Sequence, residues 1–218
     1  MSVIIPSSHE EWLEERKKGL GGSDAAAVLG ISNWKTNVQL WEEKTGLRQA
    51  EDISEKSYVQ YGHDAEPHLR ALFALDHPEL KVTYESPYKM IFSDTHPFIY
   101  ATPDGELEEI VTGRKGGLEV KTTEIMSPSQ WAKWKGRIPD EYYSQVIHQF
   151  VATGWEFIIL NAQIKWRTRD GELRKDTREY HIERIEVEED IAAYIKEAVK
   201  TWDSINKKIR PALKLPEI

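Results

Sequence analysis

The sequence contains no cysteine. A chain without thiols forms neither disulfides nor thiolate-bound metal or iron–sulfur centres. The sequence also has no apolar run long enough to cross a bilayer, and its first residues, MSVIIPSSHEEW, lack the basic start and the apolar core of a signal peptide. These absences predict a cytoplasmic protein that does not bind a membrane.

Positive charge is also scarce, because 29 lysines and arginines face 37 acidic residues and the formal net charge is −8 at pH 7. This balance argues against nucleic-acid binding over the whole surface, since phosphate contacts require local positive charge. The basic residues are clustered, however, at positions 16–18, 133–137 and 165–169. A basic groove inside an acidic outer surface is compatible with this pattern.

No repeat, low-complexity tract or linker divides the chain, so we predict a single domain over residues 1–218. Capping residues and helical periodicity predict helices at 8–18, 24–29, 36–45, 140–153 and 188–208. Another short helix begins at Pro128. A further helix ends near Leu75, and it either starts at Asp64 or kinks at Pro67. Alternating patterns predict strands at 81–85, 88–92, 98–102, 106–111, 118–122, 155–166 and 173–182, the last two joined at Asp170-Gly171.

The chemistry-bearing residues are concentrated between Thr102 and Thr122. Asp104 precedes one predicted strand, and Glu119, Val120 and Lys121 lie on the next, after a turn expected at 112–117. Because side chains alternate along a strand, Glu119 and Lys121 share one face and Val120 points into the core. Two carboxylates and an ammonium on one face are what a magnesium-dependent phosphodiesterase requires.

The pattern Pro103-Asp104 followed by Glu119-x-Lys121 resembles the PD-(D/E)XK nuclease core. Four further matches follow the order found in the phage λ exonuclease and YqaJ-type viral recombinase family: Arg16, Gly22-Ser23-Asp24, Gly62-x-x-x-Glu66 and Tyr142-x-x-Gln145. The resemblance spans roughly residues 10–165. It implies an α+β fold in which a restriction-endonuclease-like central mixed β-sheet is flanked by helices.

The resemblance also implies roles for individual residues. The ligands of Mg²⁺ (or Mn²⁺), with two ions in each site, would be oxygens of Asp104, Glu119, Val120 and Glu66. The catalytic residues would be Glu66, Asp104, Glu119, Lys121 and Gln145. The residues that bind DNA and its 5′-terminal phosphate would be Arg16, Ser23, Thr102 and Tyr142.

The activity implied by the resemblance is 5′ to 3′ degradation of one strand at double-stranded DNA ends. The remaining 3′ overhang would pass to a single-strand annealing protein during recombination, and the enzyme would act as a homotrimer in a bacterial or phage-infected cell. Two alternatives remain open. A structure-specific PD-(D/E)XK endonuclease shares the core but has no use for the Arg16–Ser23 pair, and an inactive DNA-binding module has no reason to keep Asp104, Glu119 and Lys121 together.

Several of these residues also have ordinary structural interpretations. Ser23 is a plausible helix cap, and Glu66 suits the first turn of a helix, where the helix dipole favours a carboxylate. Trp131 and Trp134, interleaved with lysines, fit base stacking and core packing equally well. Gln149 lies one helical turn after Gln145, but neither it nor His148 matches the family pattern, so neither is assigned to the site.

Overall fold

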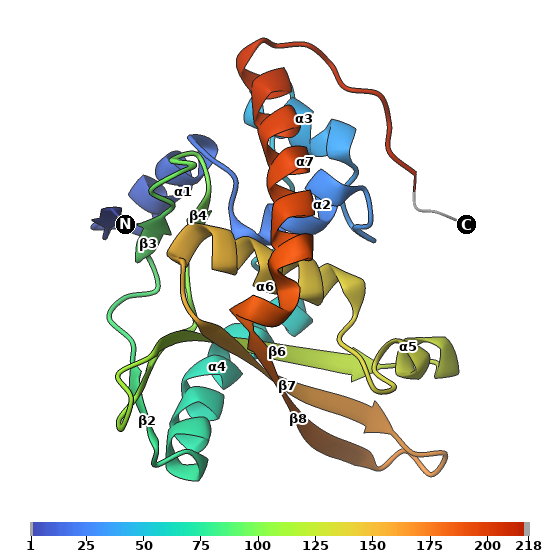
Figure 1. The fold of residues 1–218 in the computed structure, drawn as a ribbon. Coiled ribbons are helices and arrows are strands. Elements are labelled where there is room, and N and C mark those ends of the chain that lie inside the picture. The colour runs from blue at the N-terminus through green and yellow to red at the C-terminus, as the bar shows by residue number, and fades with distance from the viewer. Residues whose placement is uncertain (1, 216–218) are drawn as a thin grey trace.

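A five-stranded sheet forms the centre of the computed structural model, which describes residues 2–215 (Figure 1). The strands lie in the order β2 (Leu80–Thr83), β5 (Gly105–Glu109), β6 (Lys115–Ile125), β7 (Phe157–Arg167) and β8 (Leu173–Glu183). β6 and β7 run parallel, and all other neighbours are antiparallel. Parallel neighbours need a crossover, which the chain makes through α5 (Pro128–Lys133) and α6 (Asp140–Thr153). The mixed sheet confirms the predicted α+β class.

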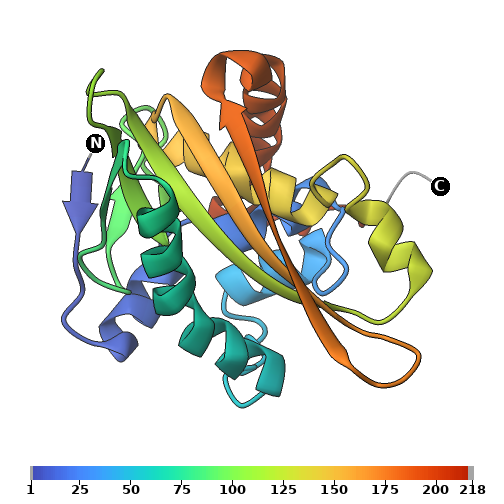
Figure 2. The ribbon, with the colours of Figure 1, turned by 90° about the horizontal axis from the view of Figure 1, so that it is seen from below.

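Helices cover both faces of this sheet (Figures 1 and 2). The long helix α4 (Ser57–Asp76) packs on one face, where Leu69 and Phe73 join Leu118 and Val120 of β6 in one buried cluster. The helix α6 packs on the other face, where its buried side chains form a larger core with β7. Since alternate residues of β6 face opposite sides, Glu119 points away from α4 and toward α6.

The N-terminal segments and the C-terminal helix enclose α6 from its far side (Figure 1). These elements are α1 (His9–Lys17), the 3₁₀ turn η1 (Gly22–Asp24), α2 (Ala25–Leu29), α3 (Asn37–Lys44), the 3₁₀ turn η2 (Arg184–Val187) and α7 (Glu188–Asn206). A second, three-stranded sheet is formed by β1 (Ser2–Ile4), β3 (Met90–Phe92) and β4 (Tyr100–Ala101).

Most predicted elements are present, but several boundaries and caps differ. The helix α4 begins at Ser57 and continues through Pro67, so the predicted start near Asp64 is wrong. Ser23 does not cap α2, because the turn η1 precedes that helix and the Ser23 hydroxyl accepts a hydrogen bond from Arg16. The sequence also predicts Asp140 as the cap of the helix that ends at Thr153, but Asp140 is the first residue of α6 and Pro139 occupies the cap position.

The turn before β6 is also shorter than predicted, because Gly116 and Gly117 belong to the strand. A Cβ atom at Gly116 would lie 2.5 Å from the Phe157 ring, and one at Gly117 would lie 2.3 Å from the Trp155 ring. These glycines therefore let two aromatic rings of the β7 region pack directly on the backbone of β6. The turn itself has its left-handed residue at Gly113, with φ +75°.

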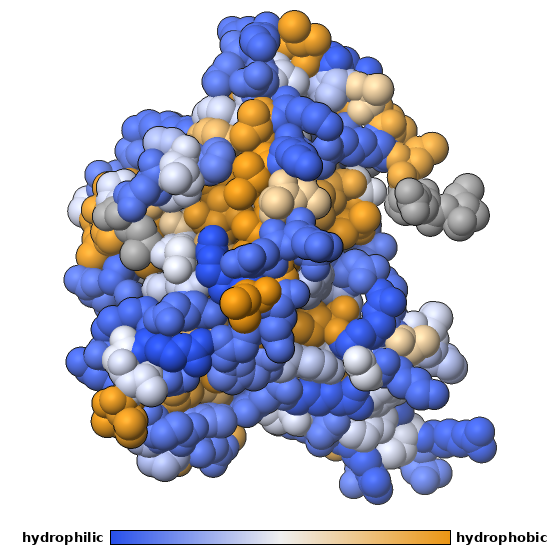
Figure 3. Space-filling model, viewed as in Figure 1, coloured by the Kyte–Doolittle hydropathy of each residue, from blue (hydrophilic) through white to orange (hydrophobic). Residues whose placement is uncertain are grey.

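Hydrophilic residues cover the end of the β7–β8 hairpin, at the lower right of Figure 3, while apolar residues gather beside α7. Among residues 2–215, none of the helices has the length and apolar composition needed to cross a bilayer. The organisation of the chain as one domain stays a prediction.

Candidate active site

The candidate site lies just before the first residue of β5, Gly105, where β6 extends beyond β5 and is paired only with β7 on its other side. The antiparallel register pairs Gly105 with Leu118, so Asp104 lies beside β6 at the level of Glu119. The Val120 N–H donates to Asp104 Oδ2 at 2.7 Å. Since the N–H and C=O of one strand residue point to the same side, the Val120 carbonyl faces the Asp104 side too. The spacing of the motif thus places Asp104 next to Glu119 and Val120, as predicted.

Glu119 is held from three directions. Only 1% of this residue is exposed. Gln145 Nε2 donates to Glu119 Oε1 at 2.6 Å, and Gln149, one turn later on α6, donates to Oε2. The Lys121 ammonium also contacts Oε1 of Glu119, which confirms that the two side chains share a face of β6. A buried carboxylate requires such partners, because its charge is otherwise costly to desolvate.

Two buried carboxylates and one ammonium shift the pKa values in this cluster. Desolvation and the Glu119 charge raise the pKa of Asp104 well above its ordinary value of 3.8. Burial lowers the pKa of Lys121, but the negative charges of Glu119 and Asp104 outweigh burial and raise it above the ordinary value of 10.5. Lys121 is therefore an ammonium at neutral pH. A further positive charge near Asp104 would stabilise its ionised form.

Glu66 comes from α4, on the other side of β6. Its carboxylate pairs with Arg70 Nη1 at 2.8 Å, an i, i+4 pair on the helix. The same Arg70 atom donates to the Asp104 carbonyl oxygen at 2.5 Å, and its guanidinium lies 3.5 Å from the centroid of the Tyr84 ring. Within residues 2–215, no three His, Asp or Glu side chains are already grouped as a metal site. Glu66 is thus linked to Asp104 through Arg70.

Arg16 and Ser23 form a second group next to the carboxylates. Arg16 Nη2 donates to Ser23 Oγ at 3.0 Å, and the guanidinium lies 4.4 Å from the centroid of the Trp12 ring. Gly22 brings this group to α6, since a Cβ atom there would lie 3.1 Å from Gln145 Cγ. The predicted phosphate-binding pair therefore adjoins the side chain that holds Glu119.

A buried ion pair fixes the turn that carries Ser23. Asp24 Oδ2 accepts from the Gly21 N–H at 3.1 Å and pairs with Lys44 at 3.0 Å. The Lys44 ammonium also donates to the carbonyl oxygens of Arg16 and Gly19, at 2.8 and 2.6 Å. Burial raises the pKa of Asp24, but Lys44, Lys35 and Arg16 outweigh burial and hold it below the usual range. The end of α1 and the Ser23 turn are thus tied to α3.

The last two predicted DNA-binding residues lie at the edges of the site. Thr102 precedes Asp104, and its Oγ1 is buried without a hydrogen-bond partner within residues 2–215. The Tyr142 ring lies 5.7 Å from the Lys121 ammonium and 5.6 Å from the Trp134 ring. Tyr142 thus borders Lys121, whereas Thr102 contributes a buried hydroxyl without a partner beside the Asp104 loop. Their contacts with DNA stay predictions.

The structure adds two side chains to the site that the sequence did not assign. Gln149 binds Glu119 directly, and Arg70 joins Glu66 to the Asp104 backbone. A sequence signal existed for both. Gln149 continues the polar stripe of Gln145 one turn along α6, and Arg70 is four residues after Glu66 on a helix. His148 has a different role, since it bonds the Tyr194 hydroxyl and the Tyr100 carbonyl in the core.

Comparison with known proteins decides the family. The model of the YqaJ-like viral recombinase domain matches residues 11–156. This chain belongs to that family. It is 34% identical over 151 residues to the uncharacterized protein YqaJ of Bacillus subtilis (strain 168), a match that covers 69% of this chain. The YqaJ-like chain spans 44% of that relative's length.

Solved structures share the fold of this YqaJ-like chain. A crystal structure of an alkaline exonuclease from Laribacter hongkongensis superimposes with a TM-score of 0.64 at 20% identity, over 92% of this chain and 94% of that one. The same exonuclease in complex with dAMP gives a TM-score of 0.62 over the same shares. The resemblance and the sheet-and-helix architecture predicted from the sequence are both confirmed.

Proposed function

We propose that this YqaJ-like chain is a metal-dependent exonuclease that degrades the 5′-ended strand of double-stranded DNA and leaves a 3′ overhang. The observation that carries the proposal is the meeting of Asp104, Glu119 and Lys121 at the open edge of β6. Family membership and the alkaline exonuclease fold support the same reaction class. A structure-specific endonuclease would share this edge, but the Arg16–Ser23 pair beside it favours action at an end.

The donor groups at this edge fit a hard divalent cation. Asp104 and Glu119 supply carboxylate oxygens and Val120 a carbonyl oxygen that faces Asp104, the ligand types that Mg²⁺ prefers and Mn²⁺ accepts. The raised pKa of Asp104 is a second sign, because a cation there would relieve the repulsion between the two carboxylates. Glu66 would be a ligand of a second ion once its salt bridge to Arg70 is broken. Bound Mg²⁺ would lower the pKa of a water molecule and offset charge on the phosphate.

The side chains have separate tasks in this proposal. The Lys121 ammonium lies on the Glu119 side and would orient the attacking water and offset negative charge on the scissile phosphate. Gln145 donates to Glu119 through one N–H and has a second to offer to the water or the phosphate. Tyr142, next to Lys121, would contact the DNA strand, and Thr102 would bond it or the backbone near Asp104.

The decisive experiment is digestion of a linear duplex labelled at each end, with a closed circular duplex as control. The expected result is release of nucleotides from the 5′-phosphorylated strand in Mg²⁺, none in excess chelator, and an intact circle. Nicking of the circle would favour the endonuclease, and DNA binding without hydrolysis in Mg²⁺ or Mn²⁺ would leave only the inactive binding module.

Arg16→Ala should reduce the preference for a 5′-phosphorylated end. Its guanidinium is held in place by Ser23 and the Trp12 face, so one charge-assisted contact to the terminal phosphate would be lost. We expect the ratio of kcat/KM values for 5′-phosphate and 5′-hydroxyl ends to fall by about ten-fold. Lys17→Ala, an exposed neighbour paired with Glu14, is the control. A wild-type protein that cleaves both ends at equal rates would contradict this role for Arg16.

Three further properties belong to the proposal. A homotrimer around DNA would account for processive action, and a single-strand annealing protein would receive the 3′ overhang. The degradation of DNA ends and the transfer of the overhang would take place in the cytoplasm of a bacterial or phage-infected cell. The mass in solution by light scattering tests the trimer directly.

A further inference from the structure

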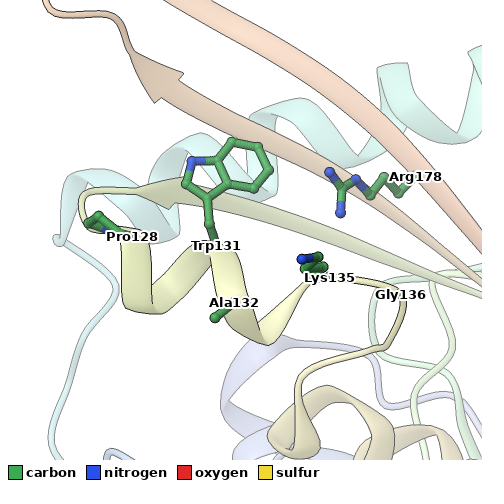
Figure 4. Close-up of a pocket in the computed structure, with 6 residues that line it drawn as sticks. All are labelled: Pro128, Trp131, Ala132, Lys135, Gly136 and Arg178. Carbon is green, nitrogen blue, oxygen red and sulfur yellow. The ribbon is translucent and has the colours of Figure 1, made fainter.

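A hollow of about 510 Å³ lies beside α5 (Figure 4). Its lining residues are Pro128, Trp131, Ala132, Lys135, Gly136 and Arg178. In Figure 4 the Trp131 ring rises from α5, and the Arg178 guanidinium reaches toward it from β8. The volume lies in the range of about 300–1,000 Å³ typical of small-molecule sites.

The two tryptophans of α5 have different environments. Trp134 is 3% exposed and packs near Tyr142 and Tyr180, so it belongs to the core. Trp131 is half-buried, with its ring edge-to-face against Trp166 at 5.1 Å, and it borders the hollow. Core packing therefore applies to Trp134, whereas Trp131 packs against the core in part and also borders the hollow.

Two cations border the same hollow. Arg178 lies 5.4 Å from the Trp131 ring centroid and is held by the Trp134 carbonyl at 2.7 Å and by Asp176 at 3.1 Å. These contacts fix the guanidinium and leave some of its N–H groups for a ligand. Lys135 is exposed and has no side-chain hydrogen bond or ion pair within residues 2–215. The hollow thus combines apolar surface, an aromatic ring and two positive charges.

The hollow also lies along the direction in which β6 leaves the catalytic edge. From Lys121 to Ile125 the strand advances about 13 Å, at roughly 3.3 Å per residue, and α5 follows directly after the strand. Trp166 of β7 lies at this end of the sheet, paired with Ile125 of β6, and its ring packs against Trp131 on the same face as α5. A DNA strand that continues for a few nucleotides from the carboxylates would reach the hollow.

We infer that this hollow binds an unpaired nucleotide of a single DNA strand, its base against Trp131 and its phosphate between Lys135 and Arg178. The base must be unpaired, because the faces of paired bases are covered by their neighbours in the duplex stack. Aromatic stacking with adjacent cations is the usual way in which proteins hold single strands without sequence preference. The choice of ligand rests on the proposed function, which produces a single strand at the neighbouring edge.

The test measures binding without cleavage. A fluorescein-labelled oligothymidylate of about ten nucleotides, a typical site size for single strands, is titrated with the full chain in chelator, and anisotropy gives the Kd. Trp131→Ala should weaken binding about ten-fold. Trp202→Ala, which removes a half-buried indole stacked on Phe98, is the matched control and should leave the Kd unchanged. The same oligonucleotide with abasic sugars should bind wild type and Trp131→Ala equally.

Lys135→Ala gives a second measurement that does not depend on core packing, since this side chain is exposed. It should reduce the slope of log Kd against log salt by about 0.7, the value for one phosphate contact on a single strand. Lys200→Ala, on α7, is its control. Equal Kd values for wild type and Trp131→Ala, or an equal loss on blunt duplex, would overturn the inference. A change in oligomer mass on Trp131→Ala would also overturn it, because the hollow would then be an interface between copies.

The binding and cleavage results separate this inference from the proposed function. A chain that binds the oligonucleotide through Trp131 but leaves duplex ends intact would refute the exonuclease and keep the nucleotide site. If the Trp131→Ala variant degrades duplex ends at the wild-type rate and its Kd for single strands is unchanged, the nucleotide site is refuted and the exonuclease proposal stands.

Discussion

Asp104→Asn should lower the rate of hydrolysis of a 5′-phosphorylated linear duplex by about a thousand-fold or more, while raising the melting temperature. The carboxylate faces Glu119 across the open edge of β6 and would be a ligand of the cation. An asparagine keeps the shape and still accepts the Val120 N–H through its side-chain oxygen, but it carries no charge. Initial rates in Mg²⁺ with an end-labelled duplex measure the first effect.

The gain in stability follows from the direction of the pKa shift. The folded-state pKa of Asp104 lies above the ordinary value of 3.8. Its contribution to the free energy of unfolding is therefore fully present below that value and is lost as the pH rises through the raised pKa. At pH values above the raised pKa this stability is lost from the metal-free fold, and asparagine, which does not titrate, avoids the loss. In a chain of this size each kcal/mol shifts the melting temperature by about 2–4 °C.

Opposite movements of rate and stability are what distinguish a functional carboxylate from a structural one. Asp203→Asn is the matched control, since Asp203 lies on the surface of α7 beside Lys207 and should change neither quantity. Wild-type hydrolysis by Asp104→Asn would refute the assignment of the site. A lower melting temperature in chelator would show that Asp104 stabilises the fold, against the direction of its pKa shift.

The central motif was predictable because it depends on local rules. Alternation along β6 fixes the faces of Glu119, Val120 and Lys121, and a hairpin register brings Asp104 opposite Glu119. The Asp170-Gly171 turn was equally clear, and Gly171 indeed has φ +83°. Each of these inferences needs only neighbouring strands or a few residues of turn.

Features that depend on tertiary packing were not predictable. The helix α4 runs through Pro67, although proline removes one helical hydrogen bond, because Leu69 and Phe73 bury the helix against the sheet. The residue before the helix, Lys56, occupies the N-cap position but its side chain makes no cap hydrogen bond, so no capping pattern marks the start of α4 in the sequence. The pairing of β1 with β3 joins short strands far apart in the sequence, and no local rule specifies it.

The environment of the site was predicted only in part for the same reason. The stripe formed by Gln145 and Gln149 on α6 was visible, but its partner Glu119 lies on another element, so the sequence did not identify the contact. The metal ligands named from the resemblance include Glu66, which the structure pairs with Arg70. The spacing of Glu66 and Arg70 is compatible with this pair, but only the three-dimensional arrangement shows that Arg70 also donates to the Asp104 carbonyl oxygen.

Gln149→Leu should lower kcat by about 10- to 100-fold, the usual effect of losing a side chain that orients a metal ligand. Gln149 donates to Oε2 of Glu119 while Gln145 donates to Oε1, so the two amides fix the plane of the carboxylate from consecutive turns of α6. Gln149 Oε1 is buried without a partner within residues 2–215. A buried amide oxygen without a partner lowers the stability of the fold. We therefore attribute the presence of Gln149 to its N–H group, which donates to Glu119.

The signature of a positioning role is a separation of metal binding from DNA binding. For Gln149→Leu we expect the Mg²⁺ concentration at half-maximal rate to rise about ten-fold, the Kd for Mg²⁺ measured by calorimetry to rise by a similar factor, and KM for DNA to stay unchanged. Gln149→Glu should not restore activity, because a third carboxylate repels Glu119. Ser144→Ala is the matched control, since Ser144 is buried on the same helix and its hydroxyl donates to the Glu141 carbonyl oxygen. If Gln149→Leu loses affinity for DNA as well as for Mg²⁺, the substitution has disrupted α6 as a whole. If its Mg²⁺ dependence equals that of wild type, Gln145 and Lys121 hold Glu119 without Gln149.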